Sequence, residues 1–342
     1  MPPPPTAKMK STSAIKPRQT IRGHTGGVTG VAHLPDGRRI ITCSGDGSLR
    51  VCNIENGVQI GNDWRDGGDG GDGDGDEGGV STVALSPNGK TVASGSENGK
   101  VRLWDVETEK VVAKWTGHAK SAGSLCWRVD GERVVSGSDD GTIRVWDVES
   151  GDTVLGPIKT GHEWVSAVIY SPDTTKIATG GYNEGALKIW DAKTGNLLST
   201  IKLGSVWSLA WTSDQKKLIA GSIDWITILD TATWQQIATL DGHTHYLYSL
   251  SLFQNDRLLV SGSTDKTARL WNLDTNLPVG PPIQHEGAVY GAAISADGKL
   301  LVTVCGENAY VWDIHTTLKD AGLEDLLSIP DVSVNRSTIL SR

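Results

Sequence analysis

The chain has 342 residues, of which 37% are hydrophobic and 21% charged, a composition typical of folded globular domains. It contains 42 glycines and 13 tryptophans but only one phenylalanine and two methionines, which favours many short strands joined by tight turns. No apolar run approaches the roughly 20 residues that cross a bilayer, and the N-terminus has no apolar segment of the signal-peptide type. The four cysteines show no metal-binding or disulfide spacing, so we expect a cytoplasmic or nuclear protein.

The formal net charge is −8, but most of it falls in one segment. Residues 62–79 hold seven acids and one arginine, so the rest of the chain is nearly neutral. Nucleic-acid binding requires a basic stripe, and the sequence has none. We therefore expect neither a nucleic-acid partner nor a membrane partner.

The chain divides into an N-terminal arm and a series of similar units. Residues 1–17 are rich in proline, contain lysines and predict a disordered arm. In the first unit an alternating apolar stretch, residues 28–34, is followed by a Pro-Asp-Gly turn and two further stretches, residues 38–44 and 48–54. A fourth stretch precedes the next unit. Each unit therefore predicts a four-stranded antiparallel sheet.

One phrase returns at intervals of about 40 residues. Clear copies are SGSENGKVRLWD ending at Asp105, SGSDDGTIRVWD ending at Asp147 and SGSTDKTARLWN ending at Asn272, and weaker copies end at Asn53, Asp191, Asp230 and Asp313. These copies, with their Gly-His and Trp-Asp signatures, resemble the WD40 family over residues 18–314, as a stand-alone seven-repeat protein similar to fungal WD40 arrays. The resemblance implies an all-β, seven-bladed β-propeller of four-stranded antiparallel blades, closed by an N-terminal strand in the last blade.

The resemblance also implies a structural role for polar residues that would otherwise suggest catalysis. In this family the Gly-His histidine, a Ser or Thr of the second strand, the tight-turn Asp and the Trp form a buried hydrogen-bond set. The matching residues are His24, Thr42 and Asp46; His118, Ser136, Asp140 and Trp146; His162 and Trp190; and His243, Ser261, Asp265 and Trp271. Buried polar groups must satisfy one another, and such sets also fix strand register. No catalytic residue is predicted.

Three units depart from the family pattern. Cys52 replaces the Trp of the first unit, the second unit has no Gly-His, and Leu229 replaces the Trp of the fifth. Blades built from these units lose internal hydrogen bonds, so we expect them to be the least stable part of the ring.

Two segments mimic ligand sites. Residues 84–91 fit a relaxed phosphate-loop pattern, but they align with a strand, a turn and a strand, and no helix follows. Asp72, Asp74 and Asp76 mimic an EF-hand loop, but Glu77 and Val83 replace its glycine and its bidentate glutamate. We expect residues 62–79 to form a flexible acidic Gly/Asp loop, with weak binding of divalent ions or of a basic peptide left open. No metal site and no cofactor are predicted.

In WD40 propellers the Gly-His connections and the tight turns lie on one face, called the top face. Aligning the units places small residues there in the first three blades and aromatic residues in the other four. We predict a partner-binding surface formed by Trp164, Tyr182, Trp207, Trp225, Tyr246, Tyr248 and Tyr290. Clustered aromatic residues near a ring centre are typical of binding hot spots. The neighbouring acidic loop favours a basic protein or peptide with an aromatic or apolar anchor.

The tail, residues 315–342, follows the last copy. Its leucines, Leu318, Leu323, Leu326 and Leu327, predict a short amphipathic helix. The expected function of the whole chain is a non-enzymatic protein-interaction scaffold. We expect a monomer, because a closed ring has little unpaired strand edge. Two alternatives stay open: binding of carbohydrate or another small ligand on the aromatic face, and an enzyme at the channel mouth.

Overall fold

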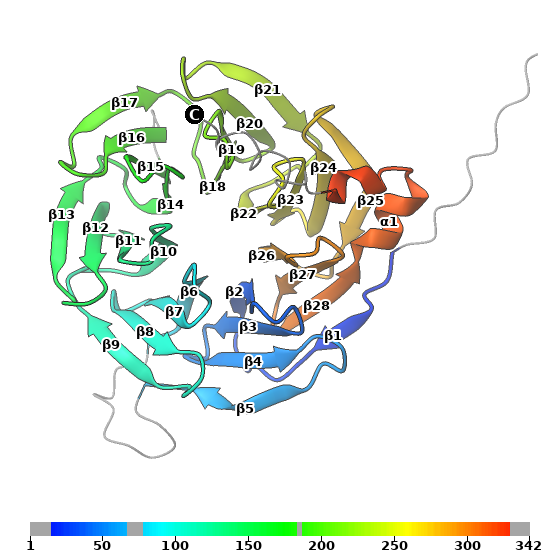
Figure 1. Ribbon diagram of the computed structural model, residues 1–342, viewed down its shortest axis with the longest axis horizontal. Coiled ribbons are helices and arrows are strands. Elements are labelled where there is room, and N and C mark those ends of the chain that lie inside the picture. Colours follow the sequence, from blue (N-terminus) through cyan, green and yellow to red (C-terminus); the bar gives the residue numbers. More distant parts are fainter. Residues whose placement is uncertain (1–14, 67–77, 183–186, 329–342) are drawn as a thin grey trace, which may run out of the picture.

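The computed structural model describes residues 15–66, 78–182 and 187–328, which form a ring of seven antiparallel sheets around a central channel (Figure 1). Each sheet has four strands and makes one blade, with its first strand at the channel and its last at the rim. The predicted all-β, seven-bladed propeller is therefore confirmed.

The first six blades follow one another along the chain, each as four consecutive strands. Blade 1 contains β2 (Val28–His33), β3 (Arg39–Ser44), β4 (Leu49–Asn53) and β5 (Gln59–Trp64). Blade 2 contains β6 (Val80–Leu85), β7 (Thr91–Ser96), β8 (Val101–Asp105) and β9 (Val111–Trp115). Blade 3 contains β10 (Ala122–Trp127), β11 (Arg133–Ser138), β12 (Thr142–Asp147) and β13 (Thr153–Lys159).

The next three blades repeat the same order. Blade 4 contains β14 (Val165–Tyr170), β15 (Lys176–Gly181), β16 (Leu187–Asp191) and β17 (Leu197–Ile201). Blade 5 contains β18 (Ser208–Trp211), β19 (Lys217–Gly221), β20 (Trp225–Asp230) and β21 (Gln236–Asp241). Blade 6 contains β22 (Leu247–Leu252), β23 (Leu258–Ser263), β24 (Thr267–Asn272) and β25 (Leu277–Gln284).

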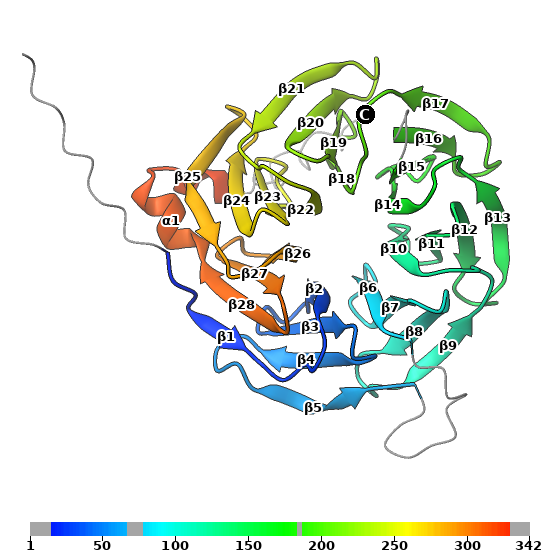
Figure 2. The same cartoon turned by 180° about the vertical axis from the view of Figure 1, so that it is seen from behind.

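Blade 7 is built from both ends of the propeller. It contains β26 (Val289–Ile294), β27 (Leu300–Cys305), β28 (Asn308–Asp313) and β1 (Gln19–Ile21). The N-terminal strand β1 lies antiparallel to β28, with Ile21 opposite Ala309, and Figure 2 shows the two strands side by side from behind. Ile21 is buried in an apolar cluster shared by blades 7 and 1. The predicted closure by an N-terminal strand is confirmed.

The core repeats one apolar position in every blade. In each blade the second residue of the second strand is fully buried between neighbouring sheets. These residues are Ile40, Val92, Val134, Ile177, Leu218, Leu259 and Leu301. A single four-stranded sheet cannot bury both of its faces, so the radial stacking of blades supplies the core that each unit lacks.

Hydroxyl groups near the channel join neighbouring blades. The inner strands are sheet edges, so their outward backbone groups have no partner within the blade. Five hydroxyls bond to such groups in the next blade. Thr29 donates to the Val80 carbonyl at 2.7 Å and Ser208 to the Leu247 carbonyl at 2.8 Å. Ser124, Ser249 and Ser251 accept from the N–H groups of Val168 at 2.9 Å, Ala292 at 3.0 Å and Ile294 at 3.2 Å, respectively. The blades are thus linked by directional bonds as well as by apolar packing.

The C-terminal segment packs against the closing blades. Helix α1 (Ile314–Asp320) begins directly after β28, and the Asp313 carboxylate caps it by accepting from the N–H of Thr316. A 3₁₀ helix, η1 (Glu324–Leu327), follows. The helix predicted for the tail therefore starts one residue before the tail assigned from the sequence. Leu318 and Leu326 are buried in the cluster of blades 6 and 7, whereas Leu323 and Leu327 are only partly buried.

The N-terminal arm predicted for residues 1–17 is described only from Ile15 onwards. Ile15 packs against the same cluster as the C-terminal helices. The two ends of the described chain thus meet beside blade 7 and cover its outer part (Figure 1). Residues 1–14 and 329–342 lie outside the described residues.

The segment predicted as an acidic loop, residues 62–79, differs from that prediction at its start. Its first three residues belong to β5, and the ring of Trp64 is buried 6.1 Å from that of Trp104 in blade 2. Asp66 is also buried, paired with Arg102 at 2.8 Å and Lys114 at 2.5 Å. Burial of a large aromatic side chain and pairing of a buried carboxylate outweigh the polar composition here. Residues 67–77 lie outside the described residues.

Ring closure by β1 can be tested by truncation. Deleting residues 1–22 removes the pairing with β28 and the burial of Ile21, so we expect the thermal midpoint to fall by roughly 5–10 °C. Differential scanning calorimetry measures the change. Deleting residues 1–14 removes no described contact and serves as the control. Equal midpoints for the two truncated proteins would show that β1 is dispensable.

Candidate binding face

Histidine-centred hydrogen bonds hold the connections of each complete blade. In blade 3 the Nδ1 atom of His118 lies 3.1 Å from the Asp140 carboxylate, and its Nε2 atom lies 2.7 Å from the hydroxyl of Ser136. The same hydroxyl accepts from the indole N–H of Trp146 at 2.8 Å. Because His118 precedes β10 and Asp140 lies between β11 and β12, this set places the Gly-His connection and the tight turn on the same face.

Blade 6 repeats this geometry with its own four residues. His243 lies 2.7 Å from the carboxylate of Asp265 and 2.6 Å from the hydroxyl of Ser261, which accepts from Trp271 at 2.8 Å. Neither set opens onto the channel cavity, since none of these residues lines it. Their position fits a structural role.

Other blades keep part of the set. In blade 1, His24 lies 2.9 Å from both Thr42 and Asp46, and Cys52 stands where the Trp would donate. In blade 4, Thr179 accepts from Trp190 and bonds to His162. Blade 7 has the corresponding set of His285, Thr303 and Trp312, with both bonds at 2.8 Å. Thr179 and Thr303 were missed from the sequence, although both occupy the position of Ser136 in their units.

Burial favours the neutral form of His162 and His285. It lowers the pKa of His285 to about 4 and, together with the charge of Lys188, lowers that of His162 to about 4. The tight-turn carboxylate of Asp140 behaves oppositely: burial opposes its ionisation, but hydrogen bonds from Thr142 and from the backbone lower its pKa to about 2.

Blade 2 has no Gly-His, and a buried arginine supplies bonds there instead. Arg102 of β8 donates to the hydroxyl of Ser96 at 2.5 Å and pairs with Asp66. The indole N–H of Trp104 still donates to Ser94 at 2.8 Å. The expectation that this blade loses bonds therefore overlooked Arg102.

Six of the seven aromatic residues predicted for the top face form one chain of ring contacts, which we call the aromatic arc. Its contacts, given as distances between ring centroids, are Tyr182 to Trp164 at 4.7 Å, Trp164 to Trp207 at 6.3 Å, Trp207 to Tyr246 at 4.9 Å, Trp207 to Tyr248 at 5.1 Å, Tyr246 to Tyr248 at 6.5 Å and Tyr248 to Tyr290 at 5.3 Å. The arc thus runs without a break from blade 4 to blade 7.

The members of the arc differ in exposure. Tyr182 and Tyr290, at its two ends, are 41% and 42% exposed, and the other four residues are partly buried. The seventh predicted residue, Trp225, is 43% exposed but makes no ring contact with another described aromatic residue. It stands apart because it begins β20, away from the inner strands. His245, which the sequence did not suggest, packs edge-on against Tyr246 at 4.5 Å.

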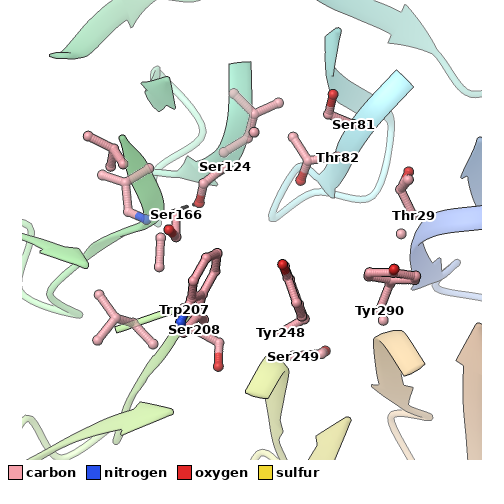
Figure 3. Close-up of a pocket in the computed structure, with 18 of the residues that line it drawn as sticks. Thr29, Ser81, Thr82, Ser124, Ser166, Trp207, Ser208, Tyr248, Ser249 and Tyr290 are labelled. Atoms are coloured by element: carbon pink, nitrogen blue, oxygen red, sulfur yellow. Dashed lines mark hydrogen bonds between the residues drawn. The ribbon is translucent and has the colours of Figure 1, made fainter. Parts of the chain in front are cut away.

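The arc borders a cavity of about 930 Å³ at the mouth of the channel. Figure 3 shows Trp207, Tyr248 and Tyr290 pointing into it from neighbouring blades, opposite the hydroxyl-bearing Thr82 and Ser124. The cavity is therefore aromatic on one side and polar on the other.

Three charged residues also line this cavity: Lys120, Asp139 and Glu163. The sequence prediction missed them because it selected aromatic residues on the top face and passed over charged ones. Asp139 directly precedes the tight-turn Asp140, and Glu163 directly follows His162. The tight turns had already supplied Tyr182 and Trp225, so attention to their charged residues would also have found Asp139.

No cluster of three or more His, Cys, Asp or Glu side chains in the described part of the chain is arranged to hold a metal ion. Within the same ranges, no helix has the length and apolar character needed to span a membrane.

A model of the family "WD domain, G-beta repeat" matches residues 15–53, 72–105, 109–147, 155–191, 234–272 and 279–313. The chain belongs to the WD40 family. The matches leave out residues 192–233, which hold most of blade 5, the unit in which Leu229 replaces the Trp.

The curated relatives of this chain are identical to it at about a quarter to a third of the aligned residues. The periodic tryptophan protein 2 homolog of Dictyostelium discoideum is 27% identical over 66% of this chain and 25% of its own length. Protein FIZZY-RELATED 3 of Arabidopsis thaliana is 26% identical over 60% of this chain and 44% of its own length. Pre-mRNA-processing factor 19 of Mus musculus is 32% identical over 30% and 21%. The chain thus spans less than half of each of these relatives.

Replacing the serine at the same position of two blades should lower the free energy of unfolding of this WD40 propeller by unequal amounts, because the two hydroxyls make different hydrogen bonds. Ser136→Ala leaves both His118 and Trp146 without their buried partner, so we expect a loss of about 2–3 kcal/mol in the free energy of unfolding. Ser94→Ala strands only Trp104, at a cost of about 1 kcal/mol. Urea unfolding measures both. Equal losses would mean that the histidine bond adds no stability.

The neutral histidines predict a pH dependence of stability. Because the folded-state pKa of His162 and His285 lies at about 4, below the ordinary value of 6.5, their contribution is complete above pH 6.5 and is lost as the pH falls towards 4. Each histidine then lowers the free energy of unfolding by up to about 1.4 kcal/mol per pH unit.

Urea midpoints between pH 7.5 and 4.5 measure this slope. The double variant His162→Gln, His285→Gln should show a shallower slope. Part of the pH dependence that remains comes from His24 and His118, whose pKa values burial also lowers. A slope unchanged in the double variant would contradict the assignment.

Proposed function

We propose that this WD40 propeller is a non-enzymatic scaffold that binds a protein or peptide partner on its top face. The observation that carries the proposal is the aromatic arc, six rings in continuous contact beside a cavity of about 930 Å³. Aromatic side chains bury a large area for little conformational entropy, and clusters of them near the centre of a surface dominate many protein interfaces.

The charges around the cavity support a basic partner. Among the described residues that line it, Asp139 and Glu163 are acidic and Lys120 alone is basic. Carboxylates beside an apolar surface select and steer a positively charged ligand. A basic segment with an aromatic or apolar anchor therefore fits both parts of this face.

The two alternatives have less support. Enzymatic chemistry needs converging acids, bases or nucleophiles, and no histidine is among the described residues that line the cavity. A carbohydrate site needs free hydroxyl or amide groups beside its aromatic platform. Thr29, Ser124, Ser208 and Ser249 instead use their hydroxyls to join neighbouring blades.

The four cysteines support a reducing compartment, the cytosol or the nucleus, for this scaffold. All four are free thiols, and burial raises the pKa of Cys43 to about 12 and those of Cys52 and Cys126 to about 11. Buried thiols of this kind act as small apolar side chains.

The binding face is tested by affinity capture and titration with the captured partner. The triple variant Trp207→Ala, Tyr248→Ala, Tyr290→Ala should bind at least about 10-fold more weakly than the native protein, because truncated hot-spot residues cost about 2 kcal/mol or more. A rim variant that truncates three exposed apolar side chains of the outer strands, Leu197→Ala, Leu198→Ala, Ile237→Ala, should bind normally.

Because Trp207 and Tyr248 are partly buried, replacing them by alanine can also lower stability, so a second variant that changes only exposed residues is needed. Tyr182→Ala with Tyr290→Ala removes only the two exposed ends of the arc and should keep the native melting temperature while weakening binding. Normal binding by both top-face variants, or weak binding by the rim variant, would place the partner elsewhere.

A further inference from the structure

Asp139 is an unpaired carboxylate at the channel mouth. It lies in the turn between β11 and β12, where its N–H donates to the Ser121 carbonyl at 3.0 Å. Its neighbour Asp140 is bound into the His118 set, whereas the Asp139 carboxylate has no hydrogen bond or ion pair with any residue in the described ranges. Lys120 also lines the cavity, but it forms no ion pair with Asp139 within the described structure.

The surroundings of Asp139 disfavour its charge. Asp139 is exposed to solvent, but partial desolvation at the channel mouth raises the pKa of its carboxyl; the charge of Lys120 opposes this rise and the charge of Asp140 adds to it. An unpaired carboxylate in this position is stabilised by a neighbouring cation. Asp139 therefore has free oxygen atoms to accept a positively charged group.

Aromatic rings face Asp139 across the cavity. Blade 3 and blade 6 lie on opposite sides of the channel (Figure 1), and Tyr248 of β22 projects into it (Figure 3). Asp139, Trp207 and Tyr248 all line the same cavity. The charge of Asp139 is also one of the causes that raise the pKa of Tyr248, after burial and the neighbouring tyrosines. Trp207 lies beside Tyr248, with ring centroids 5.1 Å apart.

We propose that the channel mouth binds one arginine side chain of the partner, held between the carboxylate of Asp139 and the rings of Trp207 and Tyr248. This inference rests on the proposed function and specifies its ligand group. A guanidinium accepts both environments at once, since it bonds to a carboxylate through its edge and stacks on aromatic rings through its face. An ammonium is more strongly hydrated and has no flat face, so arginine is preferred to lysine.

The shape and polarity of the site suit this occupant. A cavity of about 930 Å³ is large enough to admit an arginine side chain with part of its backbone. Several hydroxyls on its polar side are engaged between blades, and Asp139 and Glu163 are the two carboxylates among the described residues that line the cavity. Lys120 is exposed, and its long side chain can turn to solvent when a guanidinium enters.

The test uses two blocked tripeptides, acetyl-Ala-Arg-Ala-amide and its citrulline counterpart, which has nearly the same shape but no charge. Binding to the full chain is followed by the NMR signal of the Trp207 indole N–H, assigned with a Trp207→Phe variant. We expect the arginine peptide to bind at least about 10-fold more tightly than the citrulline peptide, with the lysine peptide in between.

Asp139→Asn should remove most of this preference, because it keeps the shape of the side chain and deletes its charge. Glu97→Gln is the matched control: it deletes an exposed carboxylate on the same face that does not line the cavity, and the preference should persist. Both variants are checked for an unchanged melting temperature.

Equal binding of the arginine and citrulline peptides, or an undiminished preference in Asp139→Asn, would overturn the inference. If the variants of the aromatic arc nevertheless lose the captured partner, the scaffold function stands and only the arginine subsite fails. If those variants keep the partner while the arginine preference depends on Asp139, the subsite stands and the proposed binding face for the partner fails.

Discussion

The pairing of β1 with β28 is the constraint on which the rest of the molecule depends. It joins the two ends of the propeller, so no blade is left with an uncovered face. Closure also sets the width of the channel and therefore the separation of residues that come from different blades. Asp139 of blade 3 and Tyr248 of blade 6 are 109 positions apart in sequence numbering, yet the ring brings them to one cavity.

Within this ring, buried polar sets decide where each connection lies. Apolar packing holds the blades together but has little directional preference, whereas a histidine bonded at both nitrogen atoms has one orientation. The sets of blades 3 and 6 place their tight turns on the top face. The carboxylate next to that turn, Asp139, is consequently presented to the channel while Asp140 is enclosed.

The repeat pattern made most of the fold predictable. Seven copies of one phrase implied seven sheets, and the resemblance to WD40 propellers predicted that an N-terminal strand closes the ring. The errors arose where a single contact outweighed local composition. Trp64 and Asp66 stand in a Gly/Asp-rich stretch, and only the neighbouring Trp104 and Arg102, distant in the sequence, explain why they are buried.

The candidate site was predictable to a lesser extent. Alignment of the repeats identified the residues that face the channel mouth, so the six members of the aromatic arc were found. It could not show that Trp225 stands apart, because that depends on where β20 begins. It also gave no weight to Asp139, since the significance of an unpaired carboxylate appears only when the groups around it are known.

The seam between blades 4 and 5 has mechanical consequences for the binding face. Other junctions carry side-chain bonds between inner strands, but across this one the described residues record a backbone bond from Val206 to Gly181, an apolar cluster and the ring contact of Trp164 with Trp207. Packing of this kind resists separation better than it resists sliding. The aromatic arc crosses the seam at that ring contact, so a ligand lying along the arc would add contacts between two sheets whose inner strands no side-chain hydrogen bond joins in the described part of the chain.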